Sequence, residues 1–142
     1  MIGHQVFNYL TVNSVFELYN VSFRKKLQDD SFLLDARSED TLVKYIESIS
    51  PNYIINCVGV LINGSNRDPE NAIFLNSYLP HRLSRLADVI NAKLIHISTD
   101  CVFSGEKDTS YIETDEKDGN GVYAKTKGIG EVICDKHLTL RT

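Results

Sequence analysis

The chain has 142 residues, of which 42% are hydrophobic, 24% charged and 9% aromatic, a composition typical of a soluble globular domain rather than a disordered or fibrous protein. Its formal charge of −4, from 15 basic and 19 acidic side chains, excludes an overall attraction to nucleic acid or to an anionic membrane, so neither is expected as a partner. No apolar run approaches the roughly 20 residues that span a bilayer, and the first residues lack a basic-then-apolar signal pattern. The sequence therefore predicts a cytoplasmic protein.

Cysteine and histidine spacing gives no sign of a metal site or a disulfide framework. Cys57, Cys101 and Cys134 are odd in number and widely separated, and we expect them to be free thiols. His81 and His96 have no ligand spacing with cysteine or a carboxylate, which favours structural or surface roles. No bound metal is expected.

Apolar runs alternate with amphipathic segments along the chain, and no repeat or linker divides it. Helices are expected at His4–Leu10, Asp40–Ile49, Pro69–Asn91 and Tyr123–Cys134. Strands are expected at Val15–Phe23, Phe32–Leu34, Tyr53–Gly59, Leu94–Ser98 and Leu138–Arg141. The run from Tyr53 is almost continuously apolar, which is typical of a central parallel strand covered on both faces. The alternation predicts an α/β fold with a doubly wound parallel sheet.

In such sheets ligands bind beyond the carboxyl ends of the strands. Ser98, Thr99 and Asp100 follow one expected strand and place two hydroxyls and a carboxylate there, although a polar strand-to-loop turn explains them equally well. Tyr123 and Lys127 fall on one helical face, four residues apart. An ammonium near a phenol favours the phenolate, which suits the pair to proton transfer. The pair opens a helix after an acidic loop, 24 residues beyond Thr99.

The stretch from Ser98 to Gly105, Ser-Thr-Asp-Cys-Val-Phe-Ser-Gly, followed by Tyr123-x-x-x-Lys127, resembles the extended short-chain dehydrogenase/reductase superfamily. Within it the chain looks most like the dTDP-4-dehydrorhamnose reductase-type sugar-nucleotide reductases. Supporting stretches are Ile55–Gly59, Asn76–Pro80 and Leu138–Thr142, so the resemblance runs essentially from end to end. It implies a Rossmann-like, NAD(P)-binding fold and a cofactor of NADP or NAD.

The resemblance also implies roles for three side chains. Tyr123 would donate a proton to the C4 carbonyl of a nucleotide-linked 4-keto-6-deoxysugar as that carbon accepts hydride. Lys127 would hold the nicotinamide ribose and favour the Tyr123 phenolate, and Thr99 would hydrogen-bond the reacting carbonyl oxygen. A phenol, an ammonium and a hydroxyl are chemically suited to these tasks. Such a reductase would serve deoxysugar and polysaccharide biosynthesis.

The resemblance also implies cofactor contacts at several positions within the first 60 residues. Gly3 and His4 match the last part of the glycine-rich turn whose amides and following helix receive pyrophosphate. Arg24, in the run Arg24-Lys25-Lys26, follows the second strand of the family, where a 2′-phosphate would favour NADP; a solvated charge run is the alternative. Asp35, Val58 and Gly59 fall where the family contacts adenine, ribose or phosphate, although strand packing explains Val58 equally well.

Residues 1–142 are therefore expected to form a partial NAD(P)-binding Rossmann domain that lacks the first strand and the C-terminal substrate lobe. We expect this chain by itself to be an inactive fragment that binds NADP(H) weakly at best and is poorly soluble or self-associated through unpaired strand edges. Two alternatives stay open. One is a non-catalytic regulatory subunit of the same fold, as in the methionine adenosyltransferase β subunit, and the other is a sugar-nucleotide epimerase or dehydratase.

Overall fold

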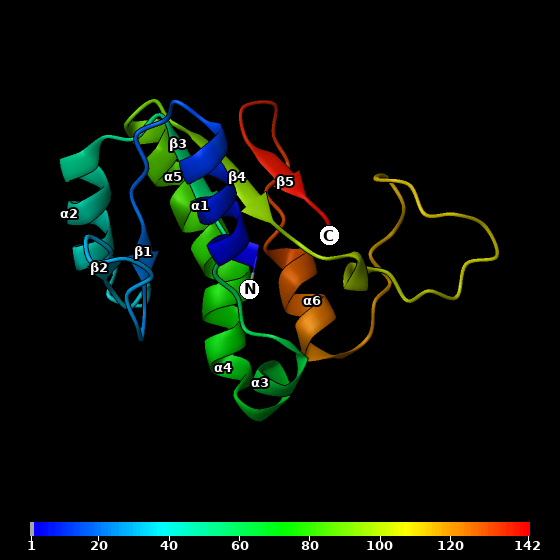
Figure 1. Cartoon of the computed structure of the whole chain (residues 1–142). Helices are drawn as coiled ribbons and strands as arrows, with labels where there is room; N and C mark the ends of the chain where they lie inside the picture. Colours follow the sequence, from blue (N-terminus) through cyan, green and yellow to red (C-terminus); the bar gives the residue numbers. More distant parts are fainter. Residues whose placement is uncertain (1) are drawn as a thin grey trace. The chain divides into compact units, whose positions relative to one another are not determined.

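The computed structural model describes residues 2–142, and the chain divides into two compact units, 1–50 and 51–142 (Figure 1). The first unit contains α1 (Ile2–Asn13), β1 (Val21–Ser22), β2 (Phe32–Leu33) and α2 (Glu39–Ile49). Strands β1 and β2 pair in parallel. Helix α2 presents Leu42 and Ile46 to the core at helical spacing, and the left-handed backbone of Ser50 ends it. No helix among the described residues is long and apolar enough to cross a membrane.

The second unit has a three-stranded parallel sheet in the order β3-β4-β5. Its strands are β3 (Tyr53–Asn56), β4 (Lys93–Ile97) and β5 (Leu138–Leu140). Its helices are α3 (Ile62–Arg67), α4 (Pro69–Ala72), the π-helix η1 (Ile73–Tyr78), α5 (Leu79–Val89), the short 3₁₀ turn η2 (Asp100–Val102) and α6 (Gly121–Ile129). The parallel pairing in both units confirms the expected α/β fold with parallel strands.

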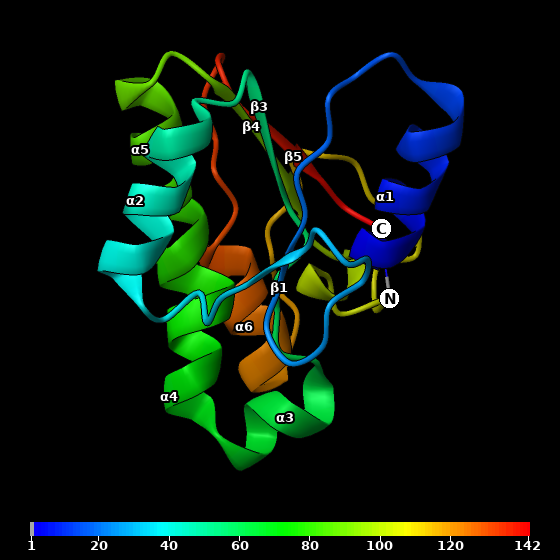
Figure 2. The same ribbon diagram turned by 60° about the vertical axis from the view of Figure 1, so that its left-hand side comes forward.

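The register of the sheet separates two faces. Asn56, His96 and Thr139 stand side by side in the ladder, and Leu94 shares their face. Leu94 and His96 are fully buried, and α5 and α6 lie on the same side of this sheet (Figure 2). Residues on the other face, Tyr53, Ile55, Leu138 and Leu140, are exposed. The buried face therefore carries the contacts between the sheet and the helices.

Several expected elements differ from the structure in extent or position. Val15–Phe23 was expected as a strand, but only Val21 and Ser22 pair, because β2 is itself only two residues long. The expectation that the strand at Tyr53 is central is wrong within this unit, where β4 lies in the middle and β3 at an edge. The last helix ends at Ile129 rather than Cys134. The next residue, Gly130, packs so closely against η1 that a Cβ there would overlap the carbonyl oxygen of Asn76.

The segment Pro69–Asn91, expected as one helix, changes its hydrogen-bond pattern in the middle. The N–H of Leu79 donates to the carbonyl of Phe74, five residues back, rather than to the residue four back. Pro80 has no N–H and cannot bond the carbonyl of Asn76, four residues before it. The π-helix therefore places Asn76 on the side of α6, where Gly130 leaves room for its carbonyl.

Candidate active site

Lys127 is the buried cation of the second unit. Its side chain lies on α6 with only 4% of its surface exposed, and its Nζ donates to the carbonyl oxygen of Ile97 at 2.6 Å. Burial lowers the pKa of Lys127 to about 8, and the Glu131 carboxylate and Cys57 oppose part of that change. Ile97 is the last residue of β4. The ammonium is therefore attached to the strand end that precedes Thr99.

Tyr123 lies on the same helix as Lys127, and Thr99 follows the strand to which Lys127 is bonded. Thr99 is 6% exposed, and its Oγ1 accepts from the N–H of Cys101 at 3.3 Å, which starts the η2 turn. Tyr123 is half-buried in the first turn of α6, one turn before Lys127 and on the same helical face. The hydrogen bond to Ile97 thus joins the helix of Tyr123 to the strand end of Thr99.

Gly59 lies beside the ammonium. A Cβ built at Gly59 would stand 4.0 Å from Lys127 Nζ and 3.2 Å from Asn76 Oδ1, so the missing side chain leaves space at the cation. Val58, one residue earlier, is 42% exposed and donates its N–H to Asn56 Oδ1 at 3.0 Å. The structure therefore brings the loop after β3 to Lys127, which joins two of the expected cofactor-binding positions to the expected catalytic helix.

Asn76 holds this loop against α6. Its Oδ1 accepts from the N–H of Val60 at 2.7 Å, and its Nδ2 donates to the carbonyl of Val60 at 3.0 Å and to Oγ1 of Thr126 at 3.1 Å. The side chain is fully buried. The sequence stretch around Asn76 contributed to the family resemblance, but this role was not predicted. The π-helix that turns Asn76 toward α6 has no simple sequence pattern.

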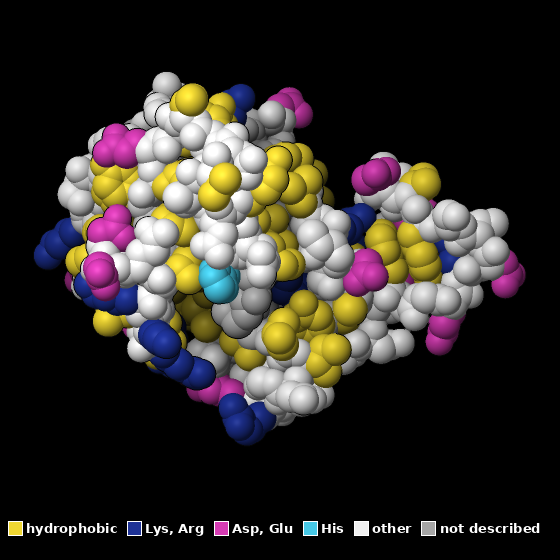
Figure 3. Space-filling view, viewed as in Figure 1, with side chains coloured by type: hydrophobic (Ala, Val, Ile, Leu, Met, Phe, Trp, Pro, Cys, Tyr) yellow, Lys and Arg dark blue, Asp and Glu magenta, His cyan; other side chains and the backbone are white. Residues whose placement is uncertain are grey.

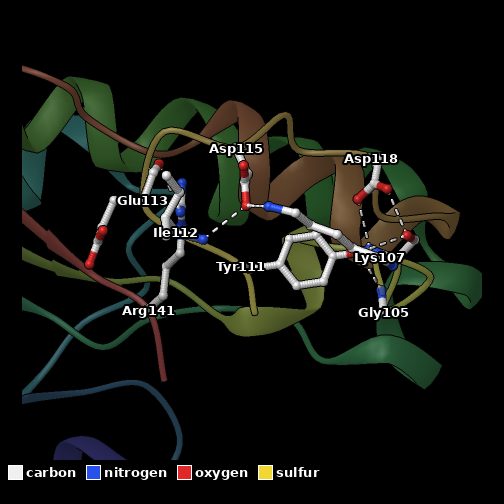
Figure 4. Close-up of polar contacts among 9 residues, drawn as sticks. Gly105, Lys107, Tyr111, Ile112, Glu113, Asp115, Asp118 and Arg141 are labelled. Atoms are coloured by element: carbon white, nitrogen blue, oxygen red, sulfur yellow. Dashed lines mark hydrogen bonds and ion pairs between the residues drawn. The ribbon is translucent and has the colours of Figure 1, made fainter. Parts of the chain in front are cut away.

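The segment between Thr99 and Tyr123 is ordered by its own polar contacts (Figure 4). The phenolic oxygen of Tyr111 accepts from the N–H groups of Gly105 and Lys107, at 3.1 and 3.2 Å. Asp115 pairs with Lys107 at 2.6 Å, and Asp118 accepts from Ser104. Acidic and hydrophobic side chains lie together on the surface of this segment, at the right of Figure 3. These contacts fix the loop that separates the two candidate catalytic elements.

In the first unit, Arg24 and Asp35 follow matching ends of the parallel strands β1 and β2. The guanidinium carbons of Arg24 and Arg37 each lie 5.7 Å from the ring centroid of Phe23. Arg37 also binds the Asp35 carboxylate at 2.6 Å, and this hydrogen bond lowers the pKa of Asp35. The sequence did not predict Arg37 at this position. Gly3 and His4 lie in the first turn of α1.

His96 and the cysteines have structural surroundings. Nδ1 of His96 lies 3.1 Å from Nδ2 of Asn56, and burial lowers the pKa of His96 to about 4. Cys57, Cys101 and Cys134 are free, as expected, and burial raises the pKa of the Cys57 thiol against the opposing charge of Lys127. In the described part of the chain no group of three or more His, Cys, Asp or Glu is arranged to hold a metal.

Acid is expected to weaken the fold through His96. The unfolded chain takes up a proton near the ordinary pKa of 6.5, whereas the folded chain does so only near 4. The unfolded state therefore binds more protons between these values, so the free energy of unfolding should fall by about 2 kcal/mol from pH 7 to pH 4.5. Urea unfolding across this range measures the slope. His96→Gln should reduce the slope of the free energy of unfolding against pH, and His4→Gln, at an exposed site, should not. Equal slopes in the parent and both variants would contradict the role given to His96.

Comparisons with known proteins show which family the chain resembles. The family described as the RmlD substrate binding domain matches residues 13–142. The dTDP-4-dehydrorhamnose reductases of Shigella flexneri and Escherichia coli K12 are each 32% identical to the chain over 113 residues, which is 76% of this chain and 38% of each relative. The chain thus spans well under half the length of these curated relatives.

Two solved structures share the fold. A hypothetical dTDP-4-dehydrorhamnose reductase from Sulfolobus tokodaii superposes with a TM-score of 0.87 at 26% identity, covering 97% of this chain and 51% of that one. The dTDP-4-dehydrorhamnose reductase of Bacillus anthracis, solved in complex with NADP, gives a TM-score of 0.69 at 24% identity, over 76% of this chain and 40% of that one. The likeness to the second shows a common fold.

Proposed function

The chain belongs to the RmlD substrate-binding domain family, and we propose that it carries the cofactor-binding and proton-donating groups of an NADP(H)-dependent reductase of a nucleotide-linked 4-keto-6-deoxysugar. The family and the α/β fold are those predicted from the sequence. The names of the curated relatives support the substrate class. The observation that carries the proposal is Lys127, a buried ammonium on the helix of Tyr123, bonded to the strand end that precedes Thr99.

Each of the three side chains has a distinct task in this reaction. Reduced nicotinamide supplies hydride to the carbonyl carbon when it is bound. Tyr123 gives its phenolic proton to the carbonyl oxygen, Thr99 orients that oxygen with its hydroxyl, and the Lys127 ammonium stabilises the phenolate that remains. The carbonyl thereby becomes a secondary alcohol with the hydrogen on carbon from the cofactor and the hydrogen on oxygen from Tyr123. An ammonium has three N–H groups, and Lys127 uses one on Ile97, which leaves donors for a ribose hydroxyl.

The residues of the chain fit such a cofactor. Gly59 presents no side chain toward Lys127, so a ribose can approach the ammonium where a Cβ would otherwise stand. Val58 and Gly59 would bind the cofactor along their backbone, and Gly3 and His4 would receive phosphate at the start of α1. We propose that residues 1–142 form part of one NAD(P)-binding domain. Its expected cytoplasmic location and its self-association belong to the same proposal.

The first experiment compares the binding of NADPH and NADH by nucleotide fluorescence. The chain should bind NADPH, and Lys127→Gln should weaken that binding because the ribose loses a charged donor. Lys125→Gln is the matched control, since Lys125 lies on the same helix but is exposed. Failure to bind either nucleotide, both in the chain alone and in the chain joined to the part of a reductase that it does not cover, would contradict the proposal. A chain that binds NADPH but transfers no hydride when joined to the part of a reductase that it does not cover would favour the non-catalytic regulatory subunit instead.

Arg24 is expected to set the preference for the phosphorylated cofactor. A 2′-phosphate at its guanidinium would gain a charge-assisted hydrogen bond worth about 1.5–3 kcal/mol. NADPH should therefore bind more tightly than NADH, and Arg24→Ala should narrow the difference. Lys44→Ala, exposed on α2 and outside the basic run, controls for the loss of one positive charge. If the parent chain binds both nucleotides equally, the basic run is only a solvated surface.

A further inference from the structure

A second buried charge, Glu131, lies just beyond α6. Only 5% of its surface is exposed. Its Oε1 accepts from Ser98 Oγ and Arg141 Nε, and its Oε2 from Arg141 Nη2, each at 2.8 Å. Lys117 Nζ lies 3.4 Å from Oε2. Burial by itself would raise the pKa of Glu131, but the hydrogen bonds from Arg141 and Ser98 hold it below its ordinary value, so the group is a fixed anion.

Glu131 and Lys127 act on consecutive residues of the same strand end. Lys127 binds the carbonyl of Ile97, and Glu131 binds the hydroxyl of Ser98. The two side chains are four residues apart, one on α6 and one directly after it. The next residue along the strand end is Thr99. Lys127 and Glu131 therefore bind Ile97 and Ser98, the two residues immediately before Thr99.

Arg141 extends the same set of contacts to the loop after Thr99. Its guanidinium carbon lies 4.8 Å from the ring centroid of Phe103, and its Nη1 donates to the carbonyl of Glu113 at 3.2 Å. Figure 4 shows Arg141 beside Glu113 at one end of that loop. Phe103 in turn stacks on Tyr111, with ring centroids 4.4 Å apart. A single buried carboxylate thus fixes both the strand end and the loop that follows it.

We propose that Glu131 is a positioning residue, which through Ser98 and Arg141 holds Thr99 in place relative to the helix that presents Tyr123 and Lys127. The inference rests on the proposed function, because the geometry that Glu131 fixes is that of the reductase site. Glu131 itself does not contact the reacting atoms, since both of its oxygens are occupied by protein donors. Its effect on the site passes through the groups that it holds.

The negative charge of Glu131 also raises the pKa of Lys127. The groups that bear on the ammonium are Glu131 and Cys57, which favour its charged form, and the neutral, buried His96. Arg141 and Lys117 are paired with Glu131 itself. Removing the negative charge while keeping the shape of the side chain should therefore make Lys127 lose its proton at a lower pH. A residue that only supported the fold from a distance would leave this titration unchanged.

The test is an NMR titration of the full 142-residue chain with isotope-labelled lysine, in which Lys127 is assigned from its absence in Lys127→Gln. In Glu131→Gln the midpoint of Lys127 should fall below its wild-type value of about 8, and the resonances of Ser98 and Thr99 should shift. Glu116→Gln, which removes the same charge from an exposed site, should change neither. An unchanged midpoint together with unchanged Thr99 resonances in Glu131→Gln would overturn the proposal.

Ser98→Ala keeps the test decisive if Glu131→Gln does not fold. It removes one hydrogen bond to the carboxylate and leaves the Arg141 pair intact, so the Thr99 resonances should shift while the Lys127 midpoint stays near wild type. Unchanged Thr99 resonances in this variant would contradict the positioning role. NADPH titration of the wild-type chain joined to the part of a reductase that it does not cover separates the two proposals. Absent binding there counts against the reductase site, whereas the NMR result decides the role of Glu131 in either case.

Discussion

Tyr123→Phe is expected to lower reductase turnover by about 10²–10⁴-fold while the affinity for NADPH stays near that of the parent. The substitution removes one hydroxyl from a half-buried ring in the first turn of α6 and leaves Lys127 with its bond to Ile97. The variant therefore lacks only the phenolic proton that the substrate's carbonyl oxygen receives during reduction. Turnover can be measured by NADPH oxidation in a chimera that joins this chain to the part of the Sulfolobus tokodaii protein that it does not cover.

Tyr9→Phe is the matched control, since Tyr9 is 66% exposed on α1 and outside the proposed site. It should leave both turnover and affinity unchanged. A Tyr123→Phe chimera that turns over as fast as its parent would remove Tyr123 from the role of proton donor. A parallel loss of NADPH affinity would instead show that the ring contributes to binding the cofactor.

The sequence predicted the parts of the fold that depend on local pattern. Strand β4 and helix α2 lie where an apolar run and helical apolar spacing placed them, because each has a face that the core buries. The same reasoning wrongly predicted a strand over Val15–Phe23. Its residues are apolar enough for a strand, but strand formation needs a partner of matching length, and β2 offers two residues. The π-helix at Asn76 was also missed, since it depends on Pro80 and Gly130 together.

The candidate site shows the same division. The spacing of Thr99, Tyr123 and Lys127 pointed to one end of the sheet, and the bond from Lys127 to Ile97 agrees with that placement. Glu131 gave no signal, because its partners Ser98 and Arg141 directly follow two different strands and meet only after folding. Buried polar groups of this kind are visible in a sequence only as charges near apolar runs.

Asn76→Ala is expected to lower the free energy of unfolding by about 4 kcal/mol. The fully buried amide makes three hydrogen bonds, two to the backbone of Val60 and one to Thr126. Alanine would leave the Val60 N–H without its partner and open a small cavity between the loop after β3 and α6. The same change should weaken NADPH binding, because the amide oxygen of Asn76 also borders Gly59 beside Lys127.

Urea unfolding of the two proteins measures the first effect, and nucleotide fluorescence below the unfolding transition measures the second. Asn63→Ala is the control, since Asn63 is exposed on α3 and alanine suits a helix at that position. Asn76→Asp is informative as well. The carboxylate of this variant can still accept from the Val60 N–H, but it cannot donate to the Val60 carbonyl or to Thr126. If the Val60 N–H is the dominant partner, the free energy of unfolding of Asn76→Asp should lie between those of the parent and Asn76→Ala; otherwise it should not. Full stability in Asn76→Ala would mean that the π-helix and Gly130 hold the loop to α6 without the amide.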